Sequence, residues 1–555
     1  MTLRSRSCSP WAVLCTLAVL PMLGQAAAPT SGELLRQAPQ TPVANPYAAP
    51  LQVLPREQAQ SQGLALPAAV KVTLQRIKLT GVTSFTAERA DAVLADAIGK
   101  QLDFSQLQGL ADQVTAYYRS QGFVAARAWL PAQRIENGVV EIAVLEGRLG
   151  RINIDAAAPL DAERLRPYLA ALVPGQPLRS QPLEEGLLRL ADLPGVRVQS
   201  VLRPGQAVGT TDLDIQVQSG QTSSGNVALD NQVNRYTGRT RLSGRLNLAG
   251  TLRTGDSIDL SVATSGSGMS YARGAWQTPV GSGGSQIGIA GSALRYRLGK
   301  QFASAESSGR ASDLTLYALT SLLRSRAASA QAQVALDIKR FDDLASGLRS
   351  NKRAQVLALG LSGNRQDTFG GASQGSLTLG MGRLQLDAGA TGSDAYRTAG
   401  SYAKLGASFD HQRAIGESYT GSLRVAAQLA GKNLDSSEKL GLGGPQGVRA
   451  YAGGAASSDD ALLMSVELSR ELWGVRAKLF GDVGLGRIAH TPLAATATSP
   501  GDTHNSRHLY ALGIGADASL PAGLQLQAAA AVPVGSNDAQ DERGPRLWLQ
   551  LSRNF

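Results

Sequence analysis

One arginine stands out as a residue that could do specific chemistry. Arg449 ends a glycine-rich stretch, Gly441–Tyr451, and lies between Val448 and the pair Ala450-Tyr451. Glycine lets a backbone turn tightly and adopt positive φ, and an arginine held in a confined space needs an acidic partner. The stretch therefore predicts a long flexible loop that carries one cation to a carboxylate elsewhere in the chain.

The other reactive residue types form no catalytic or metal-binding pattern. No His-Glu-x-x-His spacing occurs among the four histidines, His411, His490, His504 and His508. No Ser/His/Asp set can be proposed, and the phosphate-binding Gly-x-x-x-x-Gly-Lys-Ser/Thr loop is missing. Asp459-Asp460 could suggest calcium, but we interpret it as a solvated loop pair. We expect no enzyme activity, no catalytic residue, no metal and no cofactor.

Both cysteines, Cys8 and Cys15, lie in a segment typical of an export signal. Two arginines form its positive start, Trp11–Leu23 forms its apolar centre, and small residues follow as cleavage sites. The apolar run is short for a membrane-spanning helix. We predict a cleaved signal peptide over 1–27. The mature protein then has no cysteine, which excludes disulfides, thiolate metal sites and a cysteine nucleophile.

Composition points to several domains and a large β region. The chain has 555 residues, which predicts two or more domains. The net charge of +11 is spread without Lys/Arg runs or basic-aromatic interleaving, so we expect no nucleic-acid partner. Glycine is abundant, with 62 residues and no collagen period, which favours an all-β region over disorder.

Residues 28–69 are rich in proline, glutamine and alanine and contain one short stretch that can form a helix. This stretch is Ser31–Gln37, with Ser31 as its cap and Pro39 beyond its end. An isolated helix of this length is unstable in water. It must therefore dock against another part of the protein or remain disordered.

Residues 70–147 predict a small α+β domain in the order strand, helix, helix, strand, strand. The first helix runs from Thr86 to Ile98, and the second begins at Ser105 and has one apolar face. The two later strands are Val124–Leu130 and Val139–Leu145. Residues 148–219 repeat this order, with a helix over 160–171 and another over 183–190. A tandem duplication suggests a binding arm.

From 220 to 555 the helix signals disappear and apolar residues alternate with polar ones, as in Ile258, Leu260 and Val262. Roughly sixteen strands fit this length. An open sheet of that size would leave edges exposed, whereas a closed transmembrane β-barrel explains the alternation. The last strand has Trp548 on its polar face and ends at Phe555, which resembles the signal by which outer-membrane barrels are recognised for assembly.

These parts together resemble the TpsB-type transporters of two-partner secretion, members of the Omp85 superfamily of POTRA-bearing barrels. The matching residues are Gly122-Phe123, Pro131, Gln133, Gly138 and Glu146-Gly147 in the first module; Leu187–Leu193, Pro194-Gly195-Val196, Pro204-Gly205 and Gly209–Leu213 in the second; and Asp230-Asn231, Thr237-Gly238 and Gly255-Asp256 at the start of the barrel. The resemblance implies that 70–147 and 148–219 are POTRA domains.

The resemblance also identifies the arginine loop and the short helix. The family's signature, Val-Arg-Gly-Tyr or Val-Arg-Gly-Phe, corresponds here to Val448, Arg449, Ala450 and Tyr451, within a long loop over 432–460. Alanine replaces glycine, so a positive φ at Ala450 would be strained. The helix with Leu34, Leu35 and Arg36 resembles the family's N-terminal plug helix.

The family's companion motif, Phe-x-Asp-x-Gly, matches Phe480, Asp482 and Gly484. The resemblance implies that Asp482 on the inner wall meets Arg449. Alternation agrees, because Asp482 lies on the face opposite Leu479 and Leu485 and so faces the lumen. Phe480 shares the face of Asp482, which weakens this argument. The alternative is a solvated surface aspartate.

By resemblance, the protein is a pore in the outer membrane of a Gram-negative cell, with its POTRA domains in the periplasm. It would capture an unfolded, secreted TpsA-like exoprotein by β-augmentation, pass it through the barrel without ATP and be closed at rest by the plug helix and the loop. Its other partners would be outer-membrane lipid and the barrel-assembly machinery, and we expect a monomer. The alternatives are an insertase of the same superfamily, a passive porin, and an autotransporter, which would need a passenger on the same chain.

Overall fold

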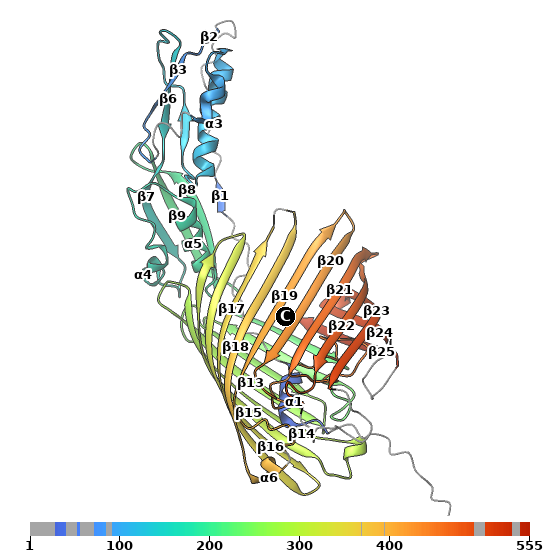
Figure 1. Cartoon of the computed structure of the whole chain (residues 1–555). Coiled ribbons are helices and arrows are strands. Elements are labelled where there is room, and N and C mark those ends of the chain that lie inside the picture. Colours follow the sequence, from blue (N-terminus) through green and yellow to red (C-terminus); the bar gives the residue numbers. More distant parts are fainter. Residues whose placement is uncertain are drawn as a thin grey trace, which may run out of the picture.

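The computed structural model describes residues 28–39, 53–55, 71–84, 92–367, 369–392, 394–492, 505–535 and 544–555. Two small α/β domains extend from one end of a large β-barrel, and a short helix lies inside the barrel (Figure 1). The predicted signal peptide, the predicted helix start at Thr86 and His504 lie outside the described residues.

The barrel is closed by sixteen antiparallel strands, in which β25 pairs back onto β10. The predicted fold and strand number are therefore confirmed. The strands are β10 (Ser223–Asp230), β11 (Arg241–Ala249), β12 (Ser257–Thr264), β13 (Met269–Val280), β14 (Ser285–Arg297), β15 (Ser308–Arg324), β16 (Ala328–Ala345), β17 (Leu348–Gln366), β18 (Gly371–Leu386), β19 (Gly400–Ile415), β20 (Tyr419–Ala430), β21 (Asp460–Leu472), β22 (Val475–Arg487), β23 (Ser506–Leu520), β24 (Leu524–Pro533) and β25 (Arg546–Asn554).

Alternation along each strand separates an apolar outer face from a polar inner face. On β16, Val334 and Leu336 are exposed on the outside, while Ala335 is buried and Lys339 reaches a loop inside the barrel. A belt of exposed aliphatic side chains around a closed barrel is the surface that lipid requires. None of the described helices is long and apolar enough to span a membrane.

The first α/β domain has the order β2 (Val72–Thr73), β3 (Arg76–Thr80), η1 (Ala92–Ala97), β4 (Gln101–Leu102), α3 (Phe104–Ser120), β5 (Arg127–Trp129) and β6 (Val139–Leu145). Two expectations were wrong in detail. The second helix begins at Phe104, one residue before Ser105, and its N-cap is Asp103, because Asp103 and Gln106 form a capping box. The described end of the first helix, 92–97, is a 3₁₀ helix.

The second α/β domain contains β7 (Arg148–Ala156), α4 (Ala162–Leu165), η2 (Arg166–Leu169), α5 (Ser180–Ala191), β8 (Val196–Pro204) and β9 (Thr210–Ser219). The predicted helix over 160–171 is split because Pro167 lacks an N–H and the chain tightens into η2. The sheet order is β1-β8-β9-β7, in which β1 (Val53–Pro55) comes from the linker and pairs in parallel with β8.

An ion pair joins the second domain to the end of the barrel from which the two domains extend. Arg324, at the end of β15, donates from Nε and Nη2 to the two carboxylate oxygens of Asp192, each at 2.8 Å. Both side chains are nearly buried. Since Asp192 follows α5 directly, this bidentate contact fixes the arm to one edge of the barrel.

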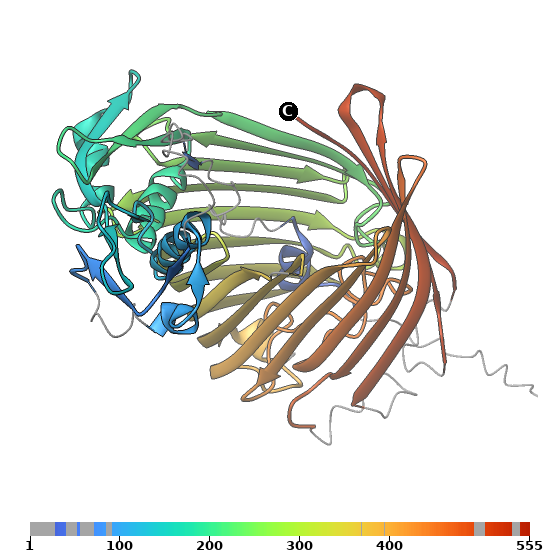
Figure 2. The same ribbon diagram turned by 90° about the horizontal axis from the view of Figure 1, so that it is seen from above.

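The short helix α1 (Ser31–Gln37) lies within the barrel (Figure 2). Its N-cap is Thr30, whose side chain accepts a hydrogen bond from the Glu33 N–H, so the expected cap at Ser31 was wrong by one residue. Leu34 and Leu35 are buried in a cluster with wall residues such as Leu294 and Phe341. The isolated helix is too short to be stable, and the wall supplies its stabilisation. Elsewhere in the described ranges there are three further helical turns, η3 (Lys300–Phe302), α6 (Ala388–Gly392) and η5 (Pro521–Gly523).

Candidate functional site: the loop and the plug helix inside the barrel

The long loop between β20 and β21, residues 431–459, folds into the barrel and carries Arg449 to the wall. Arg449 donates from Nε to Oδ2 of Asp482 at 2.9 Å and from Nη2 to Oδ1 at 2.7 Å. Its backbone N–H also donates to Oδ2 at 3.0 Å. The expected partner of the arginine is therefore in place on β22, and the pair has the bidentate geometry that makes arginine–carboxylate contacts specific.

Two residues of β21 complete the surroundings of the guanidinium. Arg449 donates from Nη1 to Glu467 at 3.1 Å and from Nη2 to Ser465 at 3.0 Å. Ser465 donates in turn to Asp482 at 2.8 Å, and the two residues are register partners on adjacent strands. The Asp482 side chain is 1% exposed and that of Arg449 13%. A charge pair this buried depends on every one of these partners, because an unpaired member would be costly.

The structure gives each position of the Phe-x-Asp-x-Gly motif a contact with the loop. The guanidinium carbon of Arg449 lies 3.2 Å from the centroid of the Phe480 ring, a cation–π contact. A Cβ at Gly484 would lie 2.8 Å from Cγ2 of Val448, so only glycine leaves room for the loop. Phe480 faces the lumen because its ring stacks on the arginine. Its position on the same face as Asp482 is therefore consistent with a lumenal Asp482.

The signature residues beside Arg449 are fully packed. Val448, Ala450 and Tyr451 are at most 1% exposed and belong to a core with Leu442 and Phe480. Ala450 does not have a positive φ. The expected strain from alanine in place of glycine is therefore absent, and this departure from the family pattern does not distort the loop.

The two aromatic residues predicted as an assembly signal occupy different environments. Trp548 on β25 is buried in the lumen and donates its indole N–H to the carbonyl oxygen of Arg449 at 2.7 Å. Phe555 is 63% exposed, and its backbone pairs with Gly225 of β10 at the seam of the barrel. Trp548 therefore holds the loop, a contact that the sequence reasoning missed. The assembly signal itself stays a prediction.

The plug helix α1 rests on the same loop as well as on the wall. Arg36 donates from Nη2 to Ser457 at 2.9 Å, and the hydroxyl oxygens of Thr30 and Ser436 are 2.7 Å apart. On the other side, the Ser31 N–H donates to Asp343 of β16 at 2.9 Å. Helix and loop thus occupy the lumen as one packed unit.

A second set of ion pairs, also missed from the sequence, fixes the outer part of the loop. Glu438 pairs with Lys339 at 2.9 Å and Lys404 at 2.8 Å, while Asp435 pairs with Lys352 at 2.7 Å. Burial alone would raise the pKa of Glu438, but the two lysines outweigh it and hold that pKa below its usual range. Single lysines on separate strands leave no local sequence signal.

The expected solvated pair Asp459-Asp460 was wrong. Asp459 is fully buried, accepts from the backbone N–H groups of Leu434 and His490, and pairs with Lys439 at 2.8 Å. Asp460 accepts from the Ala430 N–H. Both aspartates organise the base of the loop. Within the described ranges no group of three or more His, Cys, Asp or Glu residues could hold a metal ion.

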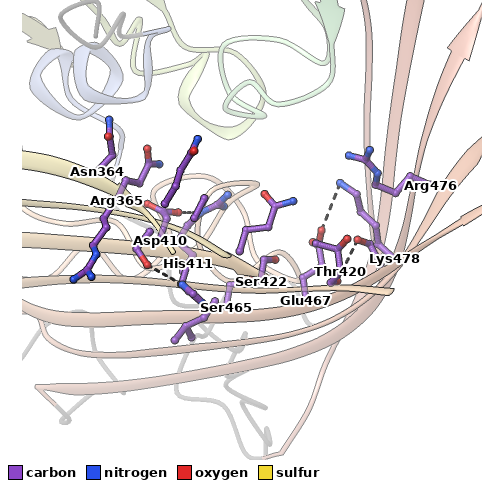
Figure 3. Close-up of a pocket in the computed structure, with 18 of the residues that line it drawn as sticks. Asn364, Arg365, Asp410, His411, Thr420, Ser422, Ser465, Glu467, Arg476 and Lys478 are labelled. Atoms are coloured by element: carbon purple, nitrogen blue, oxygen red, sulfur yellow. Dashed lines mark hydrogen bonds and ion pairs between the residues drawn. The ribbon is translucent and has the colours of Figure 1, made fainter. Parts of the chain in front are cut away.

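Between the loop and the periplasmic end, the inner wall surrounds a polar hollow of about 550 Å³ (Figure 3). Its lining residues come from the end of β15 and the turn that follows it, from β17 to β22 and from the loop, and most are charged or polar. They include Asn364, Asp410, Ser422, Ser465, Glu467, Arg476 and Lys478. Mixed charge and few apolar groups give an unfolded chain little to adhere to, which suits a passage rather than a ligand pocket.

Comparisons with known proteins give one consistent result. Residues 209–499 match the family model "Haemolysin secretion/activation protein ShlB/FhaC/HecB", and residues 72–147 match "POTRA domain, ShlB-type". The heme/hemopexin transporter protein HuxB of Haemophilus influenzae (strain 86-028NP) is 26% identical over 544 residues, covering 96% of this chain and 92% of that protein. The outer membrane transporter CdiB of Escherichia coli O6:K15:H31 is 29% identical over 199 residues, 34% of each chain.

Solved structures agree at the level of the fold. CdiB from Escherichia coli has a TM-score of 0.65 at 20% identity, covering 91% of this chain and 94% of that one. CdiB from Acinetobacter baumannii has a TM-score of 0.59 at 16% identity, covering 94% and 95%. In both cases the likeness in fold extends over nearly the whole of each chain.

Proposed function

Because the chain belongs to the haemolysin secretion/activation protein family (ShlB/FhaC/HecB), it is a two-partner secretion transporter of the outer membrane, and we propose that two elements in the lumen close its pore and that the partner protein opens it. It moves a secreted partner protein across the membrane, with its POTRA domains in the periplasm. The loop latched by Arg449 and the plug helix α1 are the closed gate. An unfolded partner must displace both.

This proposal rests on the contacts by which the barrel wall holds the loop and the loop holds α1. The loop is held by Asp482 and Trp548, and α1 is held by the loop through Arg36 and Thr30. Most of these contacts are single hydrogen bonds, each contributing about 1 kcal/mol. A partner chain that enters the lumen can exchange them one at a time, without unfolding the barrel.

Capture takes place at the edges of the POTRA sheets. In the second domain, the linker strand β1 has itself added to the sheet beside β8, in parallel. This pairing supports the proposal that this side of the sheet can accept an extended segment. The other domain has short edge strands β3 and β5. A partner segment adds to such an edge by β-augmentation, in which backbone hydrogen bonds give affinity without a strict sequence requirement.

The partner is a large secreted exoprotein, and its folding outside the cell supplies the directional bias in place of ATP. HuxB is named for heme/hemopexin, so an exoprotein that takes up a haem-carrying protein is the first class to examine. The transporter acts as a monomer and has no enzymatic activity of its own. It reaches the membrane through the barrel-assembly machinery.

The test is deletion of the gene in its host, with quantitative proteomics of the culture medium, the protease-accessible cell surface and the outer membrane. One large exoprotein should disappear from medium and surface and return on complementation with the full chain, while other barrel proteins keep their levels. Unchanged exoproteins together with a general fall in barrel proteins would show an insertase instead.

A further inference from the structure

Five neighbouring strands, β14 to β18, change from apolar to arginine on their outer faces at the same end of the barrel. The outer face of β16 runs Val334, Leu336, Ile338 and then Arg340. On the other four strands, exposed aliphatic residues are followed toward the same end by arginine, and β14 and β17 carry a second one farther out, Arg297 and Arg349. The arginine nearest to the aliphatic residues on each strand belongs to one set. We name this set the arginine cluster: Arg295, Arg310, Arg340, Arg353 and Arg383, all exposed.

Two observations place the arginine cluster outside the barrel, at the end away from the POTRA arm. The neighbouring residues in sequence, Lys339 and Lys352, point inward to the loop, so Arg340 and Arg353 point outward. Arg324, at the opposite end of β15 from Arg310, is the residue that contacts the second POTRA domain. The arginine cluster therefore lies at the extracellular edge of the apolar belt.

Register brings like charges together within the arginine cluster. Arg295 is the direct partner of Arg310, and Arg340 is the direct partner of Arg353. Side chains in such positions have Cβ atoms about 5 Å apart, and like charges there are destabilising. Within the described ranges no carboxylate forms an ion pair with these five. Asp342 is the register partner of Arg310 on its other side, but its carboxylate pairs with Arg349, at 3.6 Å and largely in solvent. The pair Arg340–Arg353 has no carboxylate among its register partners.

We propose that the arginine cluster binds the phosphate groups of a phosphorylated glycolipid in the outer leaflet. A phosphate between two opposed arginines removes their repulsion and accepts the paired N–H groups that a guanidinium presents. Four of the five arginines, all but Arg383, line a hollow of about 740 Å³ together with Asp342 and Arg349, and this hollow gives the headgroup room. The aliphatic belt directly below, with Leu336 and Leu357, would take the acyl chains, so the ligand is an amphiphile and not a free anion.

The opposite side of the barrel offers a matched comparison. Arg487, at the extracellular end of β22, shares its face with the exposed Leu479 and also points outward. Its register partners are Asp460 and Ser506, so neither neighbour is an arginine, whereas Arg340 lies directly opposite Arg353. It keeps the residue type and the exposure but lacks the opposed pair that makes a phosphate site.

The experiment is a titration of the purified full chain in dodecyl maltoside, followed by native mass spectrometry. The probes are diphosphorylated hexa-acyl lipid A, the same lipid without phosphates, and inorganic phosphate as competitor. The proteins are the wild type, the double variant Arg340→Gln/Arg353→Gln, and Arg487→Gln as control. Heat-modifiable migration in gels verifies that each barrel is folded.

We expect the double variant to lose at least about tenfold in affinity for diphosphorylated lipid A, since each charge-assisted contact is worth a tenfold change or more. Arg487→Gln should stay within about twofold, because it lies outside the opposed pairs. Dephosphorylated lipid should bind weakly to every protein. Equal binding by the double variant, or equal binding of the dephosphorylated lipid, would overturn the proposal. Displacement of the lipid by millimolar inorganic phosphate would overturn the lipid assignment.

Discussion

Trp548 on the last strand donates its indole N–H to the carbonyl oxygen of Arg449 at the tip of the inward loop, at 2.7 Å. The strand that carries Trp548 closes the barrel against β10. The loop is therefore tied to the seam of the barrel as well as to Asp482 on β22. Closure of the barrel and placement of the loop depend on each other.

Replacing Trp548 by phenylalanine should weaken the loop without opening the barrel. The ring volume is largely kept, but the carbonyl of Arg449 loses its donor, at a cost of about 1–3 kcal/mol. We expect lower secretion of the partner and a larger mean single-channel conductance in planar bilayers. Trp473→Phe is the control, because Trp473 is 99% exposed in a turn. Equal conductance of both variants would contradict this role for Trp548.

Adding one methyl group at Gly484 should displace the loop. The new Cβ would lie 2.8 Å from Val448, closer than packed atoms tolerate, and such overpacking costs about 1–3 kcal/mol. Secretion should fall in Gly484→Ala and recover in the double variant Val448→Ala/Gly484→Ala. Gly481→Ala is the matched control, because its Cβ would come no closer than 3.4 Å to Leu512 and 4.0 Å to the Ala511 oxygen, which are ordinary contact distances. Equal secretion by Gly484→Ala and Gly481→Ala would contradict the predicted clash between residue 484 and Val448.

Removing either charge of the latch should strongly reduce secretion while the barrel stays inserted. Arg449→Ala leaves Asp482 buried without its partner, and breaking a buried pair costs about 3–5 kcal/mol. Asp482→Arg should act in the same way. The measurement is the amount of exported partner, normalised to heat-modifiable barrel in the membrane. Arg476→Ala is the control, since Arg476 pairs with Glu471 in solvent. Normal export by both latch variants would rule out the latch.

The first POTRA domain should lose stability in acid because of Glu146. Burial would raise the pKa of this carboxylate, but hydrogen bonds from the hydroxyl and backbone N–H groups of Ser84 and Thr83 outweigh burial and lower the pKa. A lowered pKa means that Glu146 stabilises the fold above the ordinary carboxyl range and that this contribution is lost as pH falls through the lowered value.

Hydrogen-exchange protection of residues 71–84 should therefore fall on acidification, and Glu146→Gln should reduce it already at neutral pH, by about 1–3 kcal/mol. Glu136→Gln is the control, because Glu136 is exposed and pairs only with exposed Arg134. Protection that is independent of both pH and Glu146 would show that the four hydrogen bonds do not anchor this segment.

The large-scale architecture follows from the sequence because it rests on repeated signals. Period-two alternation recurs in every barrel strand, so sixteen strands and the inward direction of Asp482 could be predicted. The position of Trp548 against Arg449 could not. Alternation places Trp548 on the lumenal face, but which lumenal residue it meets depends on barrel curvature and on the path of a 29-residue loop.

The same limit explains the other errors. The lysines that hold Glu438 and Asp435 are single residues on three strands, and nothing near them in sequence marks them as partners. Asp459-Asp460 has the composition of a solvated turn and is instead the buried base of the loop. Local sequence reports which side of a strand a residue occupies, whereas charge pairing in the lumen is decided by the tertiary path.

The most direct test of the closed gate is a reversible cross-link between plug and loop. The hydroxyl oxygens of Thr30 and Ser436 are 2.7 Å apart, so the double variant Thr30→Cys/Ser436→Cys places two thiols within bonding reach, in a mature chain expected to hold no other cysteine. With oxidant, export of the partner should stop, and reductant should restore it; each single cysteine variant should export normally under both conditions. Undiminished export by the fully cross-linked protein would contradict the claim that the partner exchanges the contacts between α1 and the loop as it passes through the lumen.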